Sequence, residues 1–231
     1  MVLTPKFNLP VQSQTIKIGS SPSNANIVLS HDKFIDDLQI GIQIKKSQFA
    51  PDENELYIMD LSLNNPTKVT VKGGNKFTLH DEAVISFGGI VRYSIKYNEP
   101  KTLMTCTLNP HFDDADLKKN QPPNEVKISV SPEPYLVGRG QKAKLNILST
   151  GLSREHCQFH FQEGQPAVLE GLSQSSNSYI YLKTSKQQHK RKVTEPVSVK
   201  SLTGMTGSVI VAFGKWELEL SNYSRAWVRV S

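Results

Sequence analysis

The chain has few cysteines and no long apolar run. Cys106 and Cys157 are the only cysteines among 231 residues, which is too few for a disulfide framework and indicates a reducing compartment. The longest apolar run, Val209–Phe213, is far shorter than the roughly 20 residues that a membrane-spanning helix needs. The first residues, MVLTPKFNLPVQ, lack the charged and apolar regions of a secretory signal. The sequence therefore predicts an intracellular protein without a membrane partner.

Aspartate is absent from the second part of the chain. No aspartate follows Asp116, and residues 128–231 hold 13 basic and 7 acidic residues, whereas residues 1–98 are almost neutral. Nearly all of the net charge of +6 therefore lies after residue 127. A basic segment favours a negatively charged partner, such as a phosphate group, a nucleic acid or an acidic protein surface.

Helical periodicity is also missing, and the alternation of apolar and polar residues typical of strands takes its place. Only residues 113–119 could form a helix, of one or two turns. Short alternating segments separated by Gly, Pro, Asn and Ser predict an all-β fold of antiparallel sandwiches. The clearest are 15–18, 40–44, 67–72, 91–97, 126–130, 157–161 and 216–220.

The alternating pattern occurs twice. Residues 99–127 hold four prolines and clustered charges, and we interpret them as a linker between residues 1–98 and residues 128–231. Four pairs of segments match in order and spacing, which indicates a tandem duplication of one domain. They are Gly19-Ser20 with Gly138-Arg139, Ile35–Ile42 with Leu152–Phe159, Ser62–Asn65 with Ser175–Ser178, and Ile85–Gly88 with Val211–Gly214.

In the second repeat, residues suited to binding phosphate stand where strands should end or begin. Gly138-Arg139 follows an expected strand, Ser153–His156 precedes another, and Ser175–Ser178 lies between two more. If these loops share one end of a sandwich, two guanidiniums, several hydroxyls and an amide converge there. The planar guanidinium of arginine suits phosphate oxygens, and a hydroxyl adds a directional donor.

This ordered set resembles the forkhead-associated (FHA) family, whose β-sandwich domains bind phosphothreonine in extended peptides. The resemblance covers residues 128–231 well and residues 1–98 more weakly. It implies that Arg139 and Ser153 bind the phosphate, and that Arg154 adds a second cation. It further implies that Ser176 contacts phosphate or neighbouring backbone, and that Asn177 contacts the peptide main chain.

The resemblance also implies supporting residues, and the sequence departs from the family at one of their neighbours. Gly138 and His156 would support the site, with His156 bracing a loop rather than touching the ligand. The family usually has glycine after the asparagine, where this chain has Ser178. Because a non-glycine residue tolerates positive φ poorly, the sequence leaves room for a different turn there.

The first repeat lacks the phosphate-binding residues. In the alignment of the two repeats, Ser20 matches Arg139, and Asp36-Asp37 matches Ser153-Arg154. A carboxylate at about 4 Å from a phosphate would repel it by roughly 1–4 kcal/mol per charge pair. We therefore expect a degenerate FHA-like domain that serves scaffolding, self-association or a phosphate-independent partner.

Other chemistry receives less support. The second repeat contains no aspartate that could orient His156 for hydrolysis, and no nucleophile-elbow glycines surround Ser153. The sequence therefore predicts no enzyme and no catalytic residue. His156, Cys157 and His160 lack a paired ligand motif, so we expect no metal and no cofactor.

The expected function is that of a non-catalytic signalling adaptor whose second domain binds phosphothreonine proteins. Two alternatives stay open: a basic β protein that binds nucleic acid, and a purely structural assembly module. We expect the basic run His189–Lys192 to be a solvated loop, a nuclear-import patch or an auxiliary contact for a phosphate-rich partner. It favours a nuclear over a cytoplasmic location slightly.

Overall fold

The computed structural model describes residues 6–8, 15–29, 34–46, 54–109, 114–183, 197–203, 208–213, 216–221 and 227–230. The chain forms two compact units. Unit 1 comprises residues 1–69 together with 186–231, and unit 2 comprises residues 70–185. The expected basic run at residues 189–192 lies outside the described residues. No helix among the described residues is long and apolar enough to cross a membrane.

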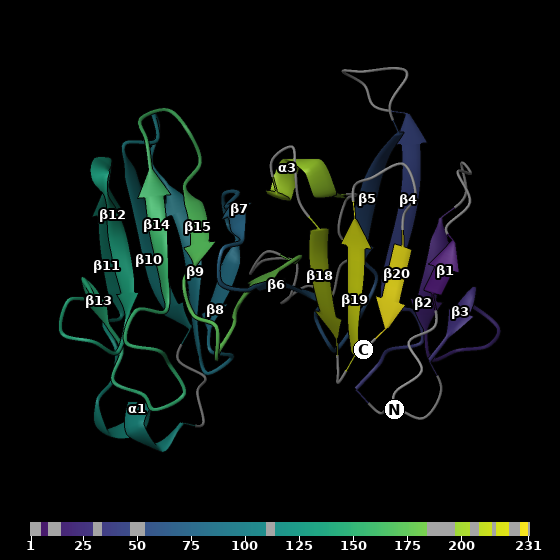
Figure 1. Cartoon of the computed structure of the whole chain (residues 1–231), viewed down its shortest axis with the longest axis horizontal. Helices are drawn as coiled ribbons and strands as arrows, with labels where there is room; N and C mark the ends of the chain where they lie inside the picture. The colour runs from purple at the N-terminus through teal and green to yellow at the C-terminus, as the bar shows by residue number, and fades with distance from the viewer. Residues whose placement is uncertain are drawn as a thin grey trace. The chain divides into compact units, whose positions relative to one another are not determined.

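Unit 2 is a continuous stretch of chain that folds into two groups of strands (Figure 1). One sheet has the order β13-β12-β14-β15-β7, and the other strands follow the order β16-β8-β9-β10-β11. The elements are β7 (Lys76–Thr78), β8 (Val84–Phe87), β9 (Val91–Tyr97), β10 (Leu103–Asn109), α1 (Ala115–Lys119), β11 (Glu125–Ser129), β12 (Ser131–Gly138), β13 (Leu145–Asn146), β14 (Cys157–Phe161), β15 (Val168–Gly171) and β16 (Ser178–Tyr181).

Aromatic side chains join the two layers of unit 2. Alternation along β9 buries Val91, Tyr93 and Ile95, as expected for a strand with one face in a core. The ring of Phe87 on β8 meets Phe159 on β14 edge-on, with centroids 6.3 Å apart. Edge-to-face pairs of this kind add about 0.5–1.5 kcal/mol beyond the burial of their area. Unit 2 is therefore held together as a β-sandwich.

Unit 1 is built from both ends of the chain. Its first sheet has the order β17-β5-β4-β2-β3, and its other strands follow the order β1-β20-β19-β18. The elements are β1 (Lys6–Asn8), β2 (Ile16–Gly19), β3 (Ile27–Val28), β4 (Ile40–Lys46), β5 (Asn54–Asp60), β17 (Val197–Ser198), α3 (Val199–Thr203), β18 (Ser208–Phe213), β19 (Trp216–Ser221) and β20 (Trp227–Val230). The remaining strand, β6 (Lys68–Val71), lies where the chain leaves unit 1 and enters unit 2.

The prediction of an all-β fold is confirmed. Each segment with clear alternation forms a strand, including 91–97 as β9 and 157–161 as β14. The short helix expected within 113–119 is α1. Its cap residue, Asp114, accepts a hydrogen bond from the backbone N–H of Leu117 at 3.0 Å.

The division into units differs from the predicted boundaries of 1–98, 99–127 and 128–231. The described part of 99–127 is not a linker, because β10 pairs with β9 on one side and with β11 on the other. Cys106 on β10 is fully buried. The four prolines of this segment lie outside β10 and β11. A proline-rich sequence can therefore still form this strand pair, because no proline interrupts either strand.

Each unit combines strands from both repeats. In unit 2, β7 and β8 of the first repeat pair with β15 and β16 of the second repeat. In unit 1, β17 of the second repeat pairs with β5 of the first, and β20 pairs with β1. The carboxy-terminal strands of the two repeats are thus exchanged within one chain.

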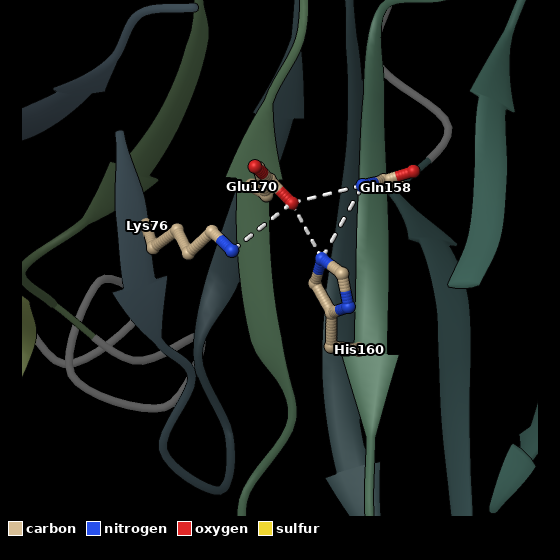
Figure 2. A network of polar contacts seen from close by, with 4 residues as sticks. All are labelled: Lys76, Gln158, His160 and Glu170. Carbon is tan, nitrogen blue, oxygen red and sulfur yellow. Dashed lines mark hydrogen bonds and ion pairs between the residues drawn. The ribbon is translucent and has the colours of Figure 1, made fainter. Parts of the chain in front are cut away.

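A polar network links β7 of the first repeat to β15 and β14 of the second repeat (Figure 2). The Oε2 atom of Glu170 on β15 accepts a hydrogen bond from Gln158 Nε2 at 2.8 Å and lies 2.5 Å from His160 Nε2. Lys76 Nζ on β7 lies 3.5 Å from the same oxygen. Burial of Glu170 opposes its ionisation, but these hydrogen bonds and the Lys76 charge outweigh burial and lower its pKa below the usual value.

Replacing Glu170 with glutamine should flatten the acid dependence of stability. A carboxyl with a lowered pKa in the folded state stabilises the protein above its unfolded pKa, and this contribution disappears as pH falls through the folded pKa. The parent should therefore lose more unfolding free energy from roughly pH 5 to 3 than Glu170→Gln. Urea titrations at several pH values measure this difference. The exposed Glu163→Gln is the control and should follow the parent; equal slopes for all three proteins would contradict the assignment.

Candidate functional site

Three loops of unit 2 meet at one end of the sandwich. The backbone N–H groups of Arg139 and Gly140 donate to the carbonyls of Ser153 and Arg154, each at 3.0 Å. The carbonyl of His156 accepts hydrogen bonds from the next loop, from the N–H groups of Leu172 and Ser173. The loops that the sequence predicted to converge are therefore adjacent.

Arg139 is held beside Ser153 by a backbone carbonyl. Its Nε donates a hydrogen bond to the carbonyl oxygen of Leu152 at 2.7 Å, and the residue is exposed. Within the described residues its two Nη groups have no hydrogen-bond or ion-pair partner. The guanidinium is therefore oriented by one nitrogen and keeps two for a ligand.

A chain of serine hydroxyls begins at Ser153, whose backbone carbonyl accepts the hydrogen bond from Arg139 N–H. Ser153 Oγ lies 2.6 Å from Ser173 Oγ and 3.2 Å from Ser175 Oγ. Ser173 Oγ lies 3.3 Å from Ser176 Oγ, which in turn lies 3.2 Å from His156 Nδ1. Ser173 and Ser175 were not predicted as site residues. The serine-rich sequence of this loop was the available signal, although composition does not say which hydroxyls face one another.

The buried side chain of His156 supports this loop through its hydrogen bond with Ser176. It is 1% exposed, and its ring meets Phe87 edge-on at 6.4 Å. Burial lowers the pKa of His156 to about 4, partly opposed by a hydrogen bond with the backbone of Asn177. The imidazole is therefore neutral at neutral pH and positions Ser176 without adding charge to the site.

For the two other predicted contact residues, Arg154 and Asn177, the structure shows hydrogen bonds of the backbone. Arg154 is exposed, and its backbone carbonyl rather than its side chain fixes the loop. The carbonyl of Asn177 accepts a hydrogen bond from Gly88 N–H at 3.0 Å. Neither side chain is linked to the serine hydroxyls by a hydrogen bond in the described part of the chain.

Ser178 does not force an unusual turn. It is the first residue of β16, is buried, and pairs with Phe87 across the sheet. Among the described non-glycine residues, positive φ occurs at Glu82 and Lys101. A glycine is therefore not needed at position 178 in this fold.

Unit 1 repeats the same backbone arrangement. Ser20 N–H donates to the Asp36 carbonyl at 3.0 Å, and Leu61 N–H donates to the Gln39 carbonyl at 3.0 Å. These bonds match those from Arg139 to Ser153 and from Leu172 to His156. Asp36 therefore takes the place of Ser153, and Gln39 takes the place of His156.

The same match corrects one part of the sequence alignment of the repeats. Because Leu61 corresponds to Leu172, Ser62 corresponds to Ser173. The sequence comparison had instead paired Ser62–Asn65 with Ser175–Ser178, two residues further along. The similar Ser and Asn content of the two loops made this shifted register look equally good.

The carboxylate of Asp36 occupies the donors of its own loop. It accepts hydrogen bonds from the backbone N–H groups of Leu63 and Asn64, the latter at 2.7 Å, and from Asn65 Nδ2 at 3.1 Å. Burial raises the pKa of Asp36, but these hydrogen bonds outweigh burial, and the net pKa is lowered. Unit 1 thus holds a negative charge of its own where unit 2 presents hydroxyls.

No family model, curated protein or solved structure matches this chain. The resemblance to FHA domains therefore stays a prediction that rests on the residues and on the geometry of the loops.

Among the described residues, no group of three or more His, Cys, Asp or Glu side chains could hold a metal ion. Cys106 and Cys157 are unpaired and buried, and burial raises the pKa of each thiol to about 12. Both cysteines are therefore protonated core residues.

Proposed function

We propose that unit 2 is a non-catalytic module that binds phosphothreonine in an extended peptide. The observation that carries this proposal is that the Leu152 carbonyl fixes the Arg139 guanidinium through Nε, in a loop whose backbone is hydrogen-bonded to that of Ser153. Fixed charge-assisted donors beside hydroxyls suit a phosphate dianion, and an oriented arginine loses less freedom on binding.

Each predicted residue has a role in this proposal. The free Nη groups of Arg139 donate to two phosphate oxygens, and Ser153 turns its hydroxyl from Ser173 toward a third oxygen. Arg154 adds positive charge, and the Asn177 amide binds the peptide main chain. Ser176, held by His156 at 3.2 Å, keeps its loop at the right distance.

The proposal predicts modest affinity. A hydrogen bond to a charged group contributes roughly 1.5–3 kcal/mol, and a micromolar dissociation constant corresponds to about 8 kcal/mol. Two arginines, a hydroxyl and a few main-chain bonds reach that range. Because the site has few charges, affinity should fall less steeply with salt than for a protein that binds many nucleic-acid phosphates.

Fluorescence titration of the full chain with a phosphothreonine peptide library tests the proposal. Arg139→Ala should weaken binding by about 30-fold, since roughly 2 kcal/mol is lost. Lys142→Ala, which removes an exposed charge from the same loop, is the matched control and should bind almost as well as the parent. Unphosphorylated and phosphoserine libraries complete the comparison.

Three outcomes would refute the phosphothreonine site. One is equal binding by Arg139→Ala and the parent, and another is equal binding of phosphorylated and unphosphorylated libraries, which would favour a structural module. The third is tighter binding of an oligonucleotide with a steep salt dependence that no single substitution removes. That result would favour a nucleic-acid-binding protein.

A further inference from the structure

A pocket opens in unit 1 at the place that corresponds to the candidate site of unit 2. Its volume is about 540 Å³, within the range of pockets that bind small ligands or a few peptide residues. Its walls include the aliphatic side chains of Ile35, Leu38, Leu61 and Leu63. Leu63 is 55% exposed, so part of the apolar wall is open to solvent.

The charge of the lining disfavours an anion in this pocket. Asp36 lines the pocket, and its carboxylate already accepts the loop donors that an external anion would need. Asp37 lines it as well. A phosphate entering here would meet two carboxylates, and the described lining residues include no cation to offset them.

The charge of the pocket is instead suited to a cation. Asp37 is exposed, and its carboxylate has no hydrogen-bond or ion-pair partner within the described residues. Among the described residues that line the pocket there is neither lysine nor arginine. The methylenes of a Lys or Arg side chain could cover the leucines while its charge reaches Asp37.

Two asparagine side chains also line the pocket. Asn24 and Asn64 face the same pocket, from the loop after β2 and the loop after β5. An asparagine side chain both donates and accepts, so it can bond the N–H and C=O groups of an extended peptide. Aliphatic walls, a carboxylate and two amides thus match a peptide rather than an isolated cation.

From this combination we propose that the pocket of unit 1 binds an unphosphorylated, extended peptide segment in which a lysine or arginine lies beside an aliphatic residue. The partner is thus recognised by positive charge, whereas the site proposed for unit 2 requires negative charge. The two sites are independent, and either proposal can fail alone.

Nuclear magnetic resonance titration of the ¹⁵N-labelled full chain tests this inference. The probes are acetyl-Leu-Lys-Leu-amide and its matched partner acetyl-Leu-Glu-Leu-amide. We expect the lysine peptide to cause saturable shifts of the backbone amides of Asn24, Asp37 and Asn64. The glutamate peptide should leave these amides unchanged.

Substitution of Asp37 separates charge recognition from nonspecific contact. Asp37→Asn should weaken the lysine peptide by about three- to fivefold, as expected for one partly exposed ion pair. Asp37→Lys should reverse the preference, so that the glutamate peptide binds better. Glu163→Gln, which removes an exposed charge from unit 2, should change nothing.

The inference is overturned if both peptides shift the same amides equally, because the pocket would then be only an apolar surface. It is also overturned if neither peptide shifts the pocket amides, or if the shifts of the lysine peptide fall on unit 2. Self-association that saturates these amides without peptide would identify a second copy of the chain as the occupant and would contradict the proposed peptide.

Discussion

A fragment of residues 70–185 is expected to fold by itself, whereas a fragment of residues 1–98 is not. The longer fragment is the continuous unit 2 and retains every pair that the strands from β7 to β16 make with one another. The shorter fragment keeps β8 and β9 but lacks their partners β16 and β10. It would expose Phe87, Tyr93 and Ile95, which are all buried in the folded chain.

The free energies involved predict that the fragment of residues 1–98 is unfolded. Exposing one large buried side chain costs about 1.5–3 kcal/mol, and the whole stability of a small domain is about 5–15 kcal/mol. Several exposed core residues therefore suffice to unfold the fragment of residues 1–98. Circular dichroism and urea unfolding should show a cooperative transition for residues 70–185 and none for residues 1–98.

The opposite result has a clear meaning. Cooperative folding of residues 1–98, with residues 70–185 unfolded, would mean that the carboxy-terminal strands of each repeat pair within their own repeat. The exchange described above would then be wrong. A point variant of residues 70–185, Phe87→Ala, provides a further control, since it should lower the unfolding free energy by roughly 3–5 kcal/mol.

The fold class followed directly from the sequence, because alternation along a strand reports which face is buried. The seven clearest alternating segments all became strands, and the lack of helical periodicity left room only for short helices. The similarity of the two repeats was visible in short segments that match in order and spacing. Gly19 and Gly138 precede equivalent loops, and the structure gives both loops the same backbone hydrogen bonds.

The exchange of strands between repeats could not be predicted in this way. Two repeats with the same alternation offer equivalent pairing edges, so local pattern does not say whether β15 pairs with a strand of its own repeat or with β7. The contacts that distinguish the two arrangements are specific side-chain contacts. Lys76 with Glu170 and Tyr97 with Phe161 are examples, and they join residues far apart in the sequence.

The candidate site was predicted in outline but not in detail. Arginine and serine at expected strand ends placed Arg139 and Ser153 in adjacent loops, because strand ends on one side of a sheet gather together. The hydroxyl chain through Ser173 and the carboxylate of Asp36 bound to its own loop depend on side-chain orientation. A sequence pattern does not contain that information. Asp36 was expected only to repel phosphate, and the structure adds that it replaces an external acceptor.

Gly138→Ala should disrupt the backbone of the candidate site. An ideal Cβ at Gly138 would lie 2.2 Å from the backbone oxygen of Arg154 and 3.0 Å from that of Ser153. Both atoms belong to the backbone, so no side-chain rotation can relieve the clash. The loops must separate and break the hydrogen bonds of Arg139 and Gly140 to Ser153 and Arg154. We expect a loss of about 2–4 kcal/mol in unfolding free energy, measured by urea titration.

A second glycine supplies the comparison. At Gly151 the nearest atom to an added Cβ is the side-chain Cδ1 of Ile90 at 3.3 Å, which can move by rotation. Gly151→Ala should therefore cost less than about 1 kcal/mol. If Gly138→Ala were as stable as Gly151→Ala, the backbone of residues 138–140 could not lie against residues 153–154. Arg139 would then no longer be held beside Ser153, and the geometric basis of the phosphate site would be lost.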